Sequence, residues 1–443
     1  MSNTNTQTNP QATPSGKAPN PFARFQGGNT KLAGFFVLAV MFLALPFVAK
    51  PILENFGPTV FSDTFSAVNS TLIFVLLALG LNIVVGYAGL LDLGYAAFFA
   101  IGGYTMGFLT ATQSKLNDTP FHTNFWVALP ISFLMAALFG VLLGAPTLGL
   151  RGDYLAIVTL GFGEIVPITF NNLTQLTGGD TGLAGLQQPK LFDFQFSSST
   201  IEAWYLIALV VVFFSIFMIR RLINSRIGRA WMAMREDEIA ASAMGIDLVK
   251  TKLLAFGLGA SFSGFAGAIF ANSLGSANPS QFKFDVSIFV LSMIILGGLG
   301  NIWGVIFGAG ALAMTDRYFI PFFTEQVRKL ADGIQLDSRL VDGVRITDPN
   351  ILKDILTNVA TNSRLLLFGL ILVTMMLVRP EGLFPSGRRK MELHAGSSKD
   401  MQPMLIGSED PLEQMAESHS LTFNPSITES TILDKHDKKH KNK

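Results

Sequence analysis

The chain lacks the residues and motifs on which several kinds of active site are built. It contains no cysteine, which excludes disulfides, thiolate metal sites and cysteine nucleophiles without identifying the compartment. It has no Gly-x-x-x-x-Gly-Lys-Ser/Thr motif, so it has no P-loop of its own for ATP. No His, Asp and Glu cluster has metal-ligand spacing, and the five histidines all lie outside the predicted membrane spans: His122, His394, His419, His436 and His440. We therefore predict no enzymatic site, no metal and no other cofactor.

Charged residues are scarce as well. They make up 14% of the chain, whereas an ordinary soluble domain carries roughly 25%. Hydrophobic residues reach 49% and the mean hydropathy is +0.44. The net charge of +1 gives no indication of nucleic-acid binding. This composition, with repeated long apolar runs, predicts an all-α polytopic membrane protein.

The apolar runs predict about ten transmembrane helices, because a helix needs about 20 apolar residues to cross the hydrocarbon. The predicted spans are 32–49, 66–86, 90–112, 126–148, 154–173, 203–222, 252–273, 286–299, 301–320 and 364–380. Some are broken by glycine and are also compatible with re-entrant segments. The stretch 286–320 fits either one tilted helix or two short helices joined at 297–301. Two helices place the basic residues near both termini in the cytoplasm, as the positive-inside rule requires, and we favour them.

This topology divides the chain into three parts. Residues 1–31 are rich in Asn, Thr, Gln, Pro and Ser, and we expect a disordered cytoplasmic tail rather than a secretory signal. Residues 32–384 form the predicted transmembrane domain. Within it, 321–363 is an extracytoplasmic insertion to which the sequence assigns no function. Residues 385–443 form a polar cytoplasmic tail. Its basic end is compatible with anionic lipid, although a solvated tail explains it more simply.

A basic segment, 220–252, separates two strongly apolar spans, and we expect it on the cytoplasmic side. Within it, Ala240 and Ala241 favour a short helix that Gly245 can end in a left-handed cap, and Glu238 suits its first turn. A short helix followed by a chain reversal is what a membrane subunit needs to dock on a soluble motor. An ordinary amphipathic loop helix explains the local pattern equally well.

Polar residues at membrane depth are candidates for the translocation path, because they are costly there. The candidates are Asn82, Asp92, Tyr104, Thr105, Thr159 and Glu164. Each also has a structural interpretation. Asn82 suits an interhelical hydrogen bond, Asp92 suits a helix cap, and Glu164 suits pairing with a partner chain. Small residues along 252–273 predict close helix packing first and a pore lining second.

Several blocks together resemble the permease subunits of bacterial ABC importers for branched-chain and other hydrophobic amino acids. They are GLLDLGYAAFFAIGGYTMG (89–107), LRGDYLAIVTLGFGEI (150–165), TGGDTGL (177–183), MREDEIAASAMG (234–245), ILGGLGNIWGVIFG (295–308) and RPEGLF (379–384). In such permeases the cytoplasmic loop with the pattern Glu-Ala-Ala, three residues, Gly contacts the ATPase. Here Ala240, Ala241 and Gly245 match, but Ile239 holds the Glu position and Glu238 precedes it.

The resemblance implies a bacterial inner-membrane complex. Its members would be this permease, a second homologous permease, two cytoplasmic ABC ATPases and an extracytoplasmic binding protein, all working by alternating access. The implied substrate is a branched-chain or other neutral amino acid. A urea or short-amide importer of the same kind is an alternative. An ion-coupled secondary transporter is an alternative of another class, disfavoured because carboxylates are scarce in the predicted spans.

Overall fold

The computed structural model describes residues 50, 60–112, 123–147, 153–191, 194–195 and 201–322, with scattered positions between 325 and 384. Both predicted tails, 1–31 and 385–443, lie outside the described residues. So do the first predicted span, 32–49, and most of the segments 321–363 and 364–380.

The described residues form a helical bundle with four two-residue strands. The longer helices are α2 (Val60–Leu81), α3 (Tyr95–Thr110), α4 (Phe125–Gly144), α5 (Asp153–Asn172), α7 (Ile201–Ile223), α8 (Arg226–Glu236), α10 (Leu248–Leu274), α11 (Phe284–Gly297) and α12 (Ile302–Met314). Two π-helices, η2 (Asn82–Tyr87) and η6 (Thr315–Phe319), extend α2 and α12. The shorter elements are η3 (Ala145–Thr147), α6 (Thr174–Thr177), η4 (Gly179–Thr181), α9 (Glu238–Ala243) and η5 (Pro279–Phe282).

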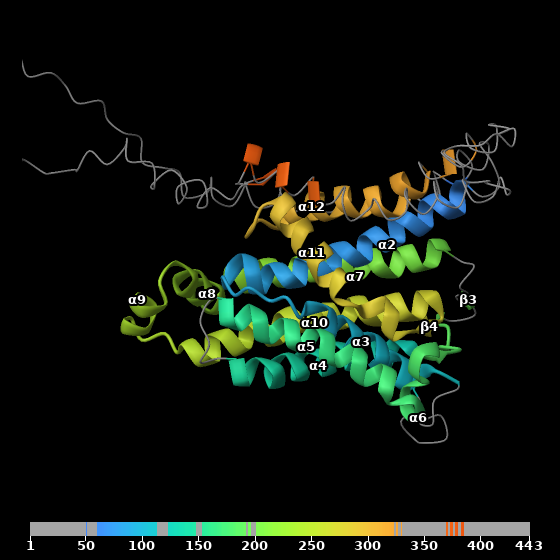
Figure 1. The fold of residues 1–443 in the computed structure, drawn as a ribbon, viewed down its shortest axis with the longest axis horizontal. Coiled ribbons are helices and arrows are strands. Elements are labelled where there is room, and N and C mark those ends of the chain that lie inside the picture. The colour runs from blue at the N-terminus through green and yellow to red at the C-terminus, as the bar shows by residue number, and fades with distance from the viewer. Residues whose placement is uncertain are drawn as a thin grey trace, which may run out of the picture. The chain divides into compact units, whose positions relative to one another are not determined.

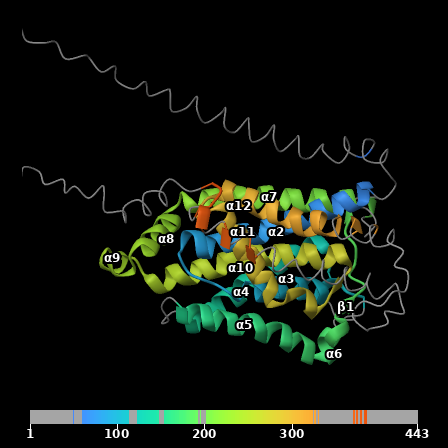
Figure 2. The ribbon, with the colours of Figure 1, turned by 45° about the horizontal axis from the view of Figure 1, so that its top comes forward.

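The strands make two antiparallel pairs that tie loops together. Strand β1 (Leu183–Ala184) pairs with β4 (Ser276–Ala277), with Leu183 opposite Ala277. Strand β2 (Lys190–Leu191) pairs with β3 (Phe194–Gln195). Helices α8 and α9 lie at one end of the bundle and α6 lies with the short strands at the other (Figures 1 and 2). We call these the α9 end and the strand end.

Six helical segments within the described residues are long and apolar enough to cross a membrane. They are Asp63–Tyr87, Phe125–Gly144, Tyr154–Asn172, Glu202–Ile223, Leu248–Leu274 and Pro279–Gly297. They correspond to six of the predicted spans, and the prediction of an all-helical polytopic membrane protein is confirmed. Helices α3 and α12 are shorter, with 16 and 13 residues. The total of ten spans stays a prediction.

Glycines interrupt the helix at one predicted place. Residues 286–320 do not form one tilted helix: α11 ends at Gly297, and Gly298 and Gly300 take positive φ angles of 111° and 77°. Asn301 then caps α12, its side-chain oxygen accepting from the Trp303 amide at 3.1 Å. The predicted span 90–112 is also shorter than expected. Its helix begins only at Tyr95, because a turn closed by Asp92 precedes it.

Helix α10 is the centre of the bundle and packs against α2, α3 and α4. The contact with α4 is close: an ideal Cβ built at Gly264 would lie 2.5 Å from the Ser132 carbonyl oxygen. The backbones can approach this far only because no side chain separates them. The predicted close-packing face of the segment 252–273 is therefore present.

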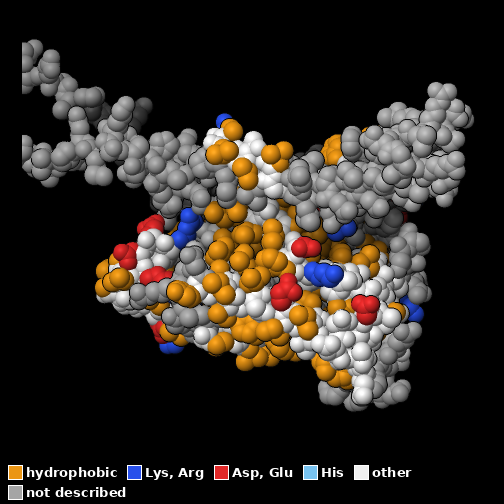
Figure 3. Space-filling model, in the orientation of Figure 1, with side chains coloured by type: hydrophobic (Ala, Val, Ile, Leu, Met, Phe, Trp, Pro, Cys, Tyr) orange, Lys and Arg blue, Asp and Glu red, His pale blue; other side chains and the backbone are white. Residues whose placement is uncertain are grey.

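The outward faces of α4 and α7 carry large apolar side chains. Leu134 and Leu138 of α4 are 62% and 51% exposed, and Val210, Phe214 and Phe217 of α7 are similarly open. Figure 3 shows a broad hydrophobic area across the middle of one face, with charged side chains on either side of it. Surfaces of this kind suit contact with lipid tails.

Candidate functional site

The basic segment predicted as a docking loop folds into the two helices α8 and α9, which we call the α8–α9 hairpin. Asp237 separates them and caps α9, because its Oδ1 accepts hydrogen bonds from the amides of Ile239 at 2.7 Å and Ala240 at 3.0 Å. The chain leaves α9 through Gly245, whose φ of +85° is left-handed. The predicted short helix followed by a glycine is therefore present.

Two contacts hold the hairpin on the start of α10. The indole of Trp231 is fully buried, and its Nε1 donates to the Thr251 carbonyl oxygen at 2.9 Å. The Lys252 ammonium forms an ion pair with the Glu238 carboxylate at 2.9 Å, and only 7% of the Lys252 side chain is exposed. Glu238 was predicted as a docking residue. Its carboxylate neutralises a buried cation and fixes α9 to α10, while its role in docking stays a prediction.

The outer side of α9 is open and apolar. Ile239 and Met244 are 72% and 84% exposed, and Ala240 is also exposed, whereas Ala241 is buried against the rest of the hairpin. No atom of the described chain lies within 4 Å of an ideal Cβ on Gly245. The sequence analysis did not single out Met244. A large apolar residue beside a helix-ending glycine in a charged loop could have indicated an exposed apolar contact residue.

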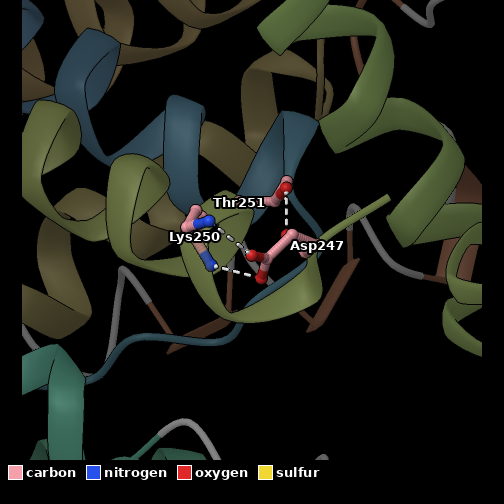
Figure 4. A network of polar contacts seen from close by, with 3 residues as sticks. All are labelled: Asp247, Lys250 and Thr251. Atoms are coloured by element: carbon pink, nitrogen blue, oxygen red, sulfur yellow. Dashed lines mark hydrogen bonds and ion pairs between the residues drawn. The ribbon is translucent and has the colours of Figure 1, made fainter. Parts of the chain in front are cut away.

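Asp247 caps α10 and fixes where the chain re-enters the bundle (Figure 4). Its Oδ1 accepts from the Lys250 amide at 3.1 Å, its Oδ2 pairs with the Lys250 ammonium at 3.1 Å, and its carbonyl accepts from the Thr251 hydroxyl at 2.6 Å. The Lys250 amide and ammonium together lower the pKa of the Asp247 carboxyl below its usual value. Asp247 thus stabilises the first turn of α10 in its ionised form.

Two of the predicted path residues, Asp92 and Thr159, come together beside the start of α3. Asp92 is 1% exposed, and its Oδ1 accepts from the Gly94 amide at 2.9 Å. The Thr159 hydroxyl of α5 accepts from the Leu93 amide at 3.0 Å. Both residues line a cavity of ≈ 10 Å³, about enough for one water molecule, and Phe256 of α10 closes another side. The turn before α3 is therefore pinned to α5.

The other four candidates do not join this cluster. Asn82 is fully buried at the α9 end, where its Oδ1 accepts from the Gly300 amide at 3.0 Å. Tyr104 is buried, with its ring 4.1 Å from that of Phe170 in α5. The Thr105 hydroxyl donates to a carbonyl one turn earlier in its own helix, Ile101, at 2.7 Å.

Glu164 is exposed on the outward face of α5. Ile165 and Ile168 beside it are 56% and 54% exposed. One turn earlier, Gly161 has no atom of the described residues within 4 Å of an ideal Cβ. The α5 surface thus differs from those of α4 and α7, since it combines a carboxylate with a bare backbone.

Nothing in the described part of the chain gathers three or more His, Cys, Asp or Glu residues closely enough to hold a metal ion. The polar groups that the structure does bring together link segments of backbone. They are suited to positioning helices rather than to bond-making chemistry.

Comparison with known proteins identifies the family. The model of the branched-chain amino acid transport system permease component matches residues 64–375. The chain belongs to this permease family. It is 37% identical over 396 residues to the high-affinity branched-chain amino acid transport system permease protein LivM of Salmonella typhimurium, covering 85% of this chain and 80% of LivM. The LivM protein of Escherichia coli K12 gives the same identity and coverage.

The chain is also similar to LivH, another high-affinity branched-chain amino acid transport system permease protein. LivH of Salmonella typhimurium is 24% identical over 281 residues, covering 60% of this chain and 87% of LivH. No solved structure matches the chain. The predicted family is confirmed, and with it the assignment as a multi-pass membrane permease and transport subunit rather than an enzyme.

Proposed function

We propose that this permease imports branched-chain amino acids in an ATP-driven complex, and that the α8–α9 hairpin docks on a separate ATPase. The observation that carries the proposal is the open apolar side of α9. Ile239 and Met244 project at the basic end of a membrane bundle, where lipid tails do not cover them. Asp237 and the Glu238–Lys252 pair hold that helix rigidly, so a partner meets a preformed surface.

The position of residues 382–384 supports a C-terminal end in the cytoplasm, as the proposed arrangement of ten spans requires. The Leu383 amide donates to the Leu296 carbonyl oxygen at 2.9 Å, so residues 382–384 lie beside the end of α11. Gly300, a few residues on, lies against the Arg235 side chain of the hairpin. The chain therefore leaves the described region at the α9 end, whose basic residues favour the cytoplasm.

The second permease of the complex, in our proposal, covers the outward face of α5. Glu164 lies eleven residues into α5, roughly 16 Å along its axis and near the middle of a hydrocarbon layer about 30 Å thick. A carboxylate at that depth needs protein or water against it rather than lipid. Gly161 one turn away allows a neighbouring helix to approach closely. We place the translocation path along this contact.

The names of the relatives support the composition of the complex. LivM and LivH of Salmonella typhimurium are both called permeases of a high-affinity branched-chain amino acid transport system, and this chain is similar to both. A pair of homologous permeases, two ATPases and an extracytoplasmic binding protein would supply the ATP site that this chain lacks, since it has no P-loop. Alternating access then follows from ATP-driven movement of the hairpin.

Uptake by cells tests this function. Radiolabelled leucine, alanine and urea are supplied to cells that lack the chain and to cells in which the wild type, Ala240→Glu or Gly245→Trp has been restored. We expect leucine uptake to depend on the chain, and both variants to reach the membrane at normal levels without restoring it. If only urea uptake is lost, the family assignment holds but urea, rather than a branched-chain amino acid, is the substrate. Full rescue by both variants would remove the docking role and favour a secondary transporter.

A further inference from the structure

The side chain of Arg235 links the α8–α9 hairpin to α2. It leaves α8 near its last turn, and its Nη1 donates to the carbonyl oxygen of Gly86 in the π-helix η2. The side chain passes two glycines with positive φ angles, Gly89 at 73° and Gly300 at 77°. Ideal Cβ atoms on these glycines would lie 2.7 Å from the Arg235 Cγ and 3.3 Å from its Nη1. Two separate loops therefore lie against the side chain of one arginine.

The same place joins α2 to the break between α11 and α12. Asn82 is fully buried in η2, and its Oδ1 accepts from the Gly300 amide at 3.0 Å. Gly86 lies against that amide, since an ideal Cβ on it would be 2.8 Å from the Gly300 nitrogen. We call Arg235, Gly86, Asn82 and Gly300 the Arg235 junction. It connects the hairpin, α2 and the α11–α12 break within one hydrogen-bonded group.

Both membrane segments at the junction depart from regular α-helix. The π-helix η2 widens the end of α2, and such segments often occur at functional sites. Residues 298–301 interrupt the helix between α11 and α12. The other anchors of the hairpin, Trp231 and Glu238, reach only the start of α10. Arg235 therefore provides a connection between the hairpin and two segments that are not rigid helix.

We propose that Arg235 is the positioning residue that couples ATPase movement to the membrane helices. When the ATPases displace the hairpin, the junction carries the displacement into η2 of α2 and into the α11–α12 break. This inference rests on the proposed docking of the hairpin on an ATPase. It adds to it a route by which docking reaches the transport path.

The test uses the whole complex in proteoliposomes with its binding protein, and it measures leucine transported and ATP hydrolysed. Arg235→Met keeps the aliphatic stem but removes the donors. Arg229→Met is the matched control, because Arg229 is an exposed arginine of the same helix whose Nη1 donates to the Asn224 carbonyl oxygen at 3.2 Å. We expect Arg235→Met to lower the leucine moved per ATP by roughly tenfold, within the range usual for coupled sites, and Arg229→Met to keep the wild-type ratio. A wild-type ratio for Arg235→Met would overturn the coupling role.

If Arg235→Met does not assemble, a distance measurement in the otherwise wild-type complex still tests the coupling role of the junction. The chain has no cysteine, so within it spin labels attach only to introduced cysteines. One label replaces exposed Ser242 on α9 and the other exposed Trp303, directly after the break at the start of α12. In the otherwise wild-type complex, the junction predicts the same distance between the labels before and after ATP is trapped. A change in that distance would overturn the proposal.

The two assays separate the two proposals. A wild-type complex that moves no leucine would contradict the proposed substrate, while the label distance still tests the junction. A complex that transports leucine, but whose leucine moved per ATP is the same in Arg235→Met and the wild type, would contradict the coupling role of the junction alone.

Discussion

The packing of α10 against α4 makes a quantitative prediction at Gly264. An ideal Cβ there would lie 2.5 Å from the Ser132 carbonyl oxygen and 2.6 Å from the Ala136 Cβ. Ordinary contact begins at 3.4 Å, so α4 and α10 must separate for Gly264→Ala to fit. Overpacking typically costs about 1–3 kcal/mol. We expect a loss of about 2–3 kcal/mol in the free energy of unfolding, because a backbone carbonyl cannot rotate away as a side chain can.

Gly161 of α5 provides the matched control. It is also a helical glycine of a predicted span, but no described atom lies within 4 Å of its ideal Cβ. Gly161→Ala should therefore leave stability unchanged or raise it by up to about 1 kcal/mol through helix propensity. Both variants are unfolded in mixed micelles and followed by tryptophan fluorescence. Equal stability of Gly264→Ala and the wild type would refute the close packing of α10.

Three further predictions concern the α9 end. Glu238→Gln should lower the free energy of unfolding by roughly 1–2 kcal/mol in the same assay. This is less than the roughly 3–5 kcal/mol usual for a fully buried pair, because Glu238 is about one-third exposed. Adding Lys252→Met should recover most of the loss, because it removes the buried charge that was left unpaired. Gly245→Ala should unfold at a lower temperature than Gly245→Asn, because asparagine tolerates the left-handed φ better; the reverse order would contradict the cap. The Asp247 pKa is lower in the folded chain, so its cap is fully present above the unfolded pKa of about 3.9 and is lost as pH falls further. The stability difference between the wild type and Asp247→Ala should therefore be constant near neutral pH and shrink in acid.

Local signals in the sequence predicted the short helix α9 and the chain reversal after it, but not helix α8. The alanines, the acidic start and Gly245 all act within one or two helical turns, so the short helix and its reversal are readable without tertiary structure. The break at Gly297–Asn301 was predictable for the same reason, since glycine favours the positive φ angles found there. The start of α3 was placed five residues early, because Leu90, Leu91 and Leu93 continue an apolar run through a non-helical turn.

The contacts that organise the site were not predictable from local pattern. Arg235 and Gly86 are separated by 149 positions, and Asn82 and Gly300 by 218. Composition identifies each as polar or small but does not say which partner it meets. Glu238 shows the same limit, because the sequence pattern did not indicate that its carboxylate would pair with the buried ammonium of Lys252.

Site-specific photo-cross-linking tests the central claim most directly. A photoreactive side chain replaces Ile239 or Met244 on α9, and, as a control, Leu134 on the apolar face of α4. After irradiation of intact cells, we predict adducts between both α9 positions and the ATPase subunits, and none from position 134. Absence of ATPase adducts from both α9 positions, in cells whose uptake is intact, would contradict docking through the α8–α9 hairpin.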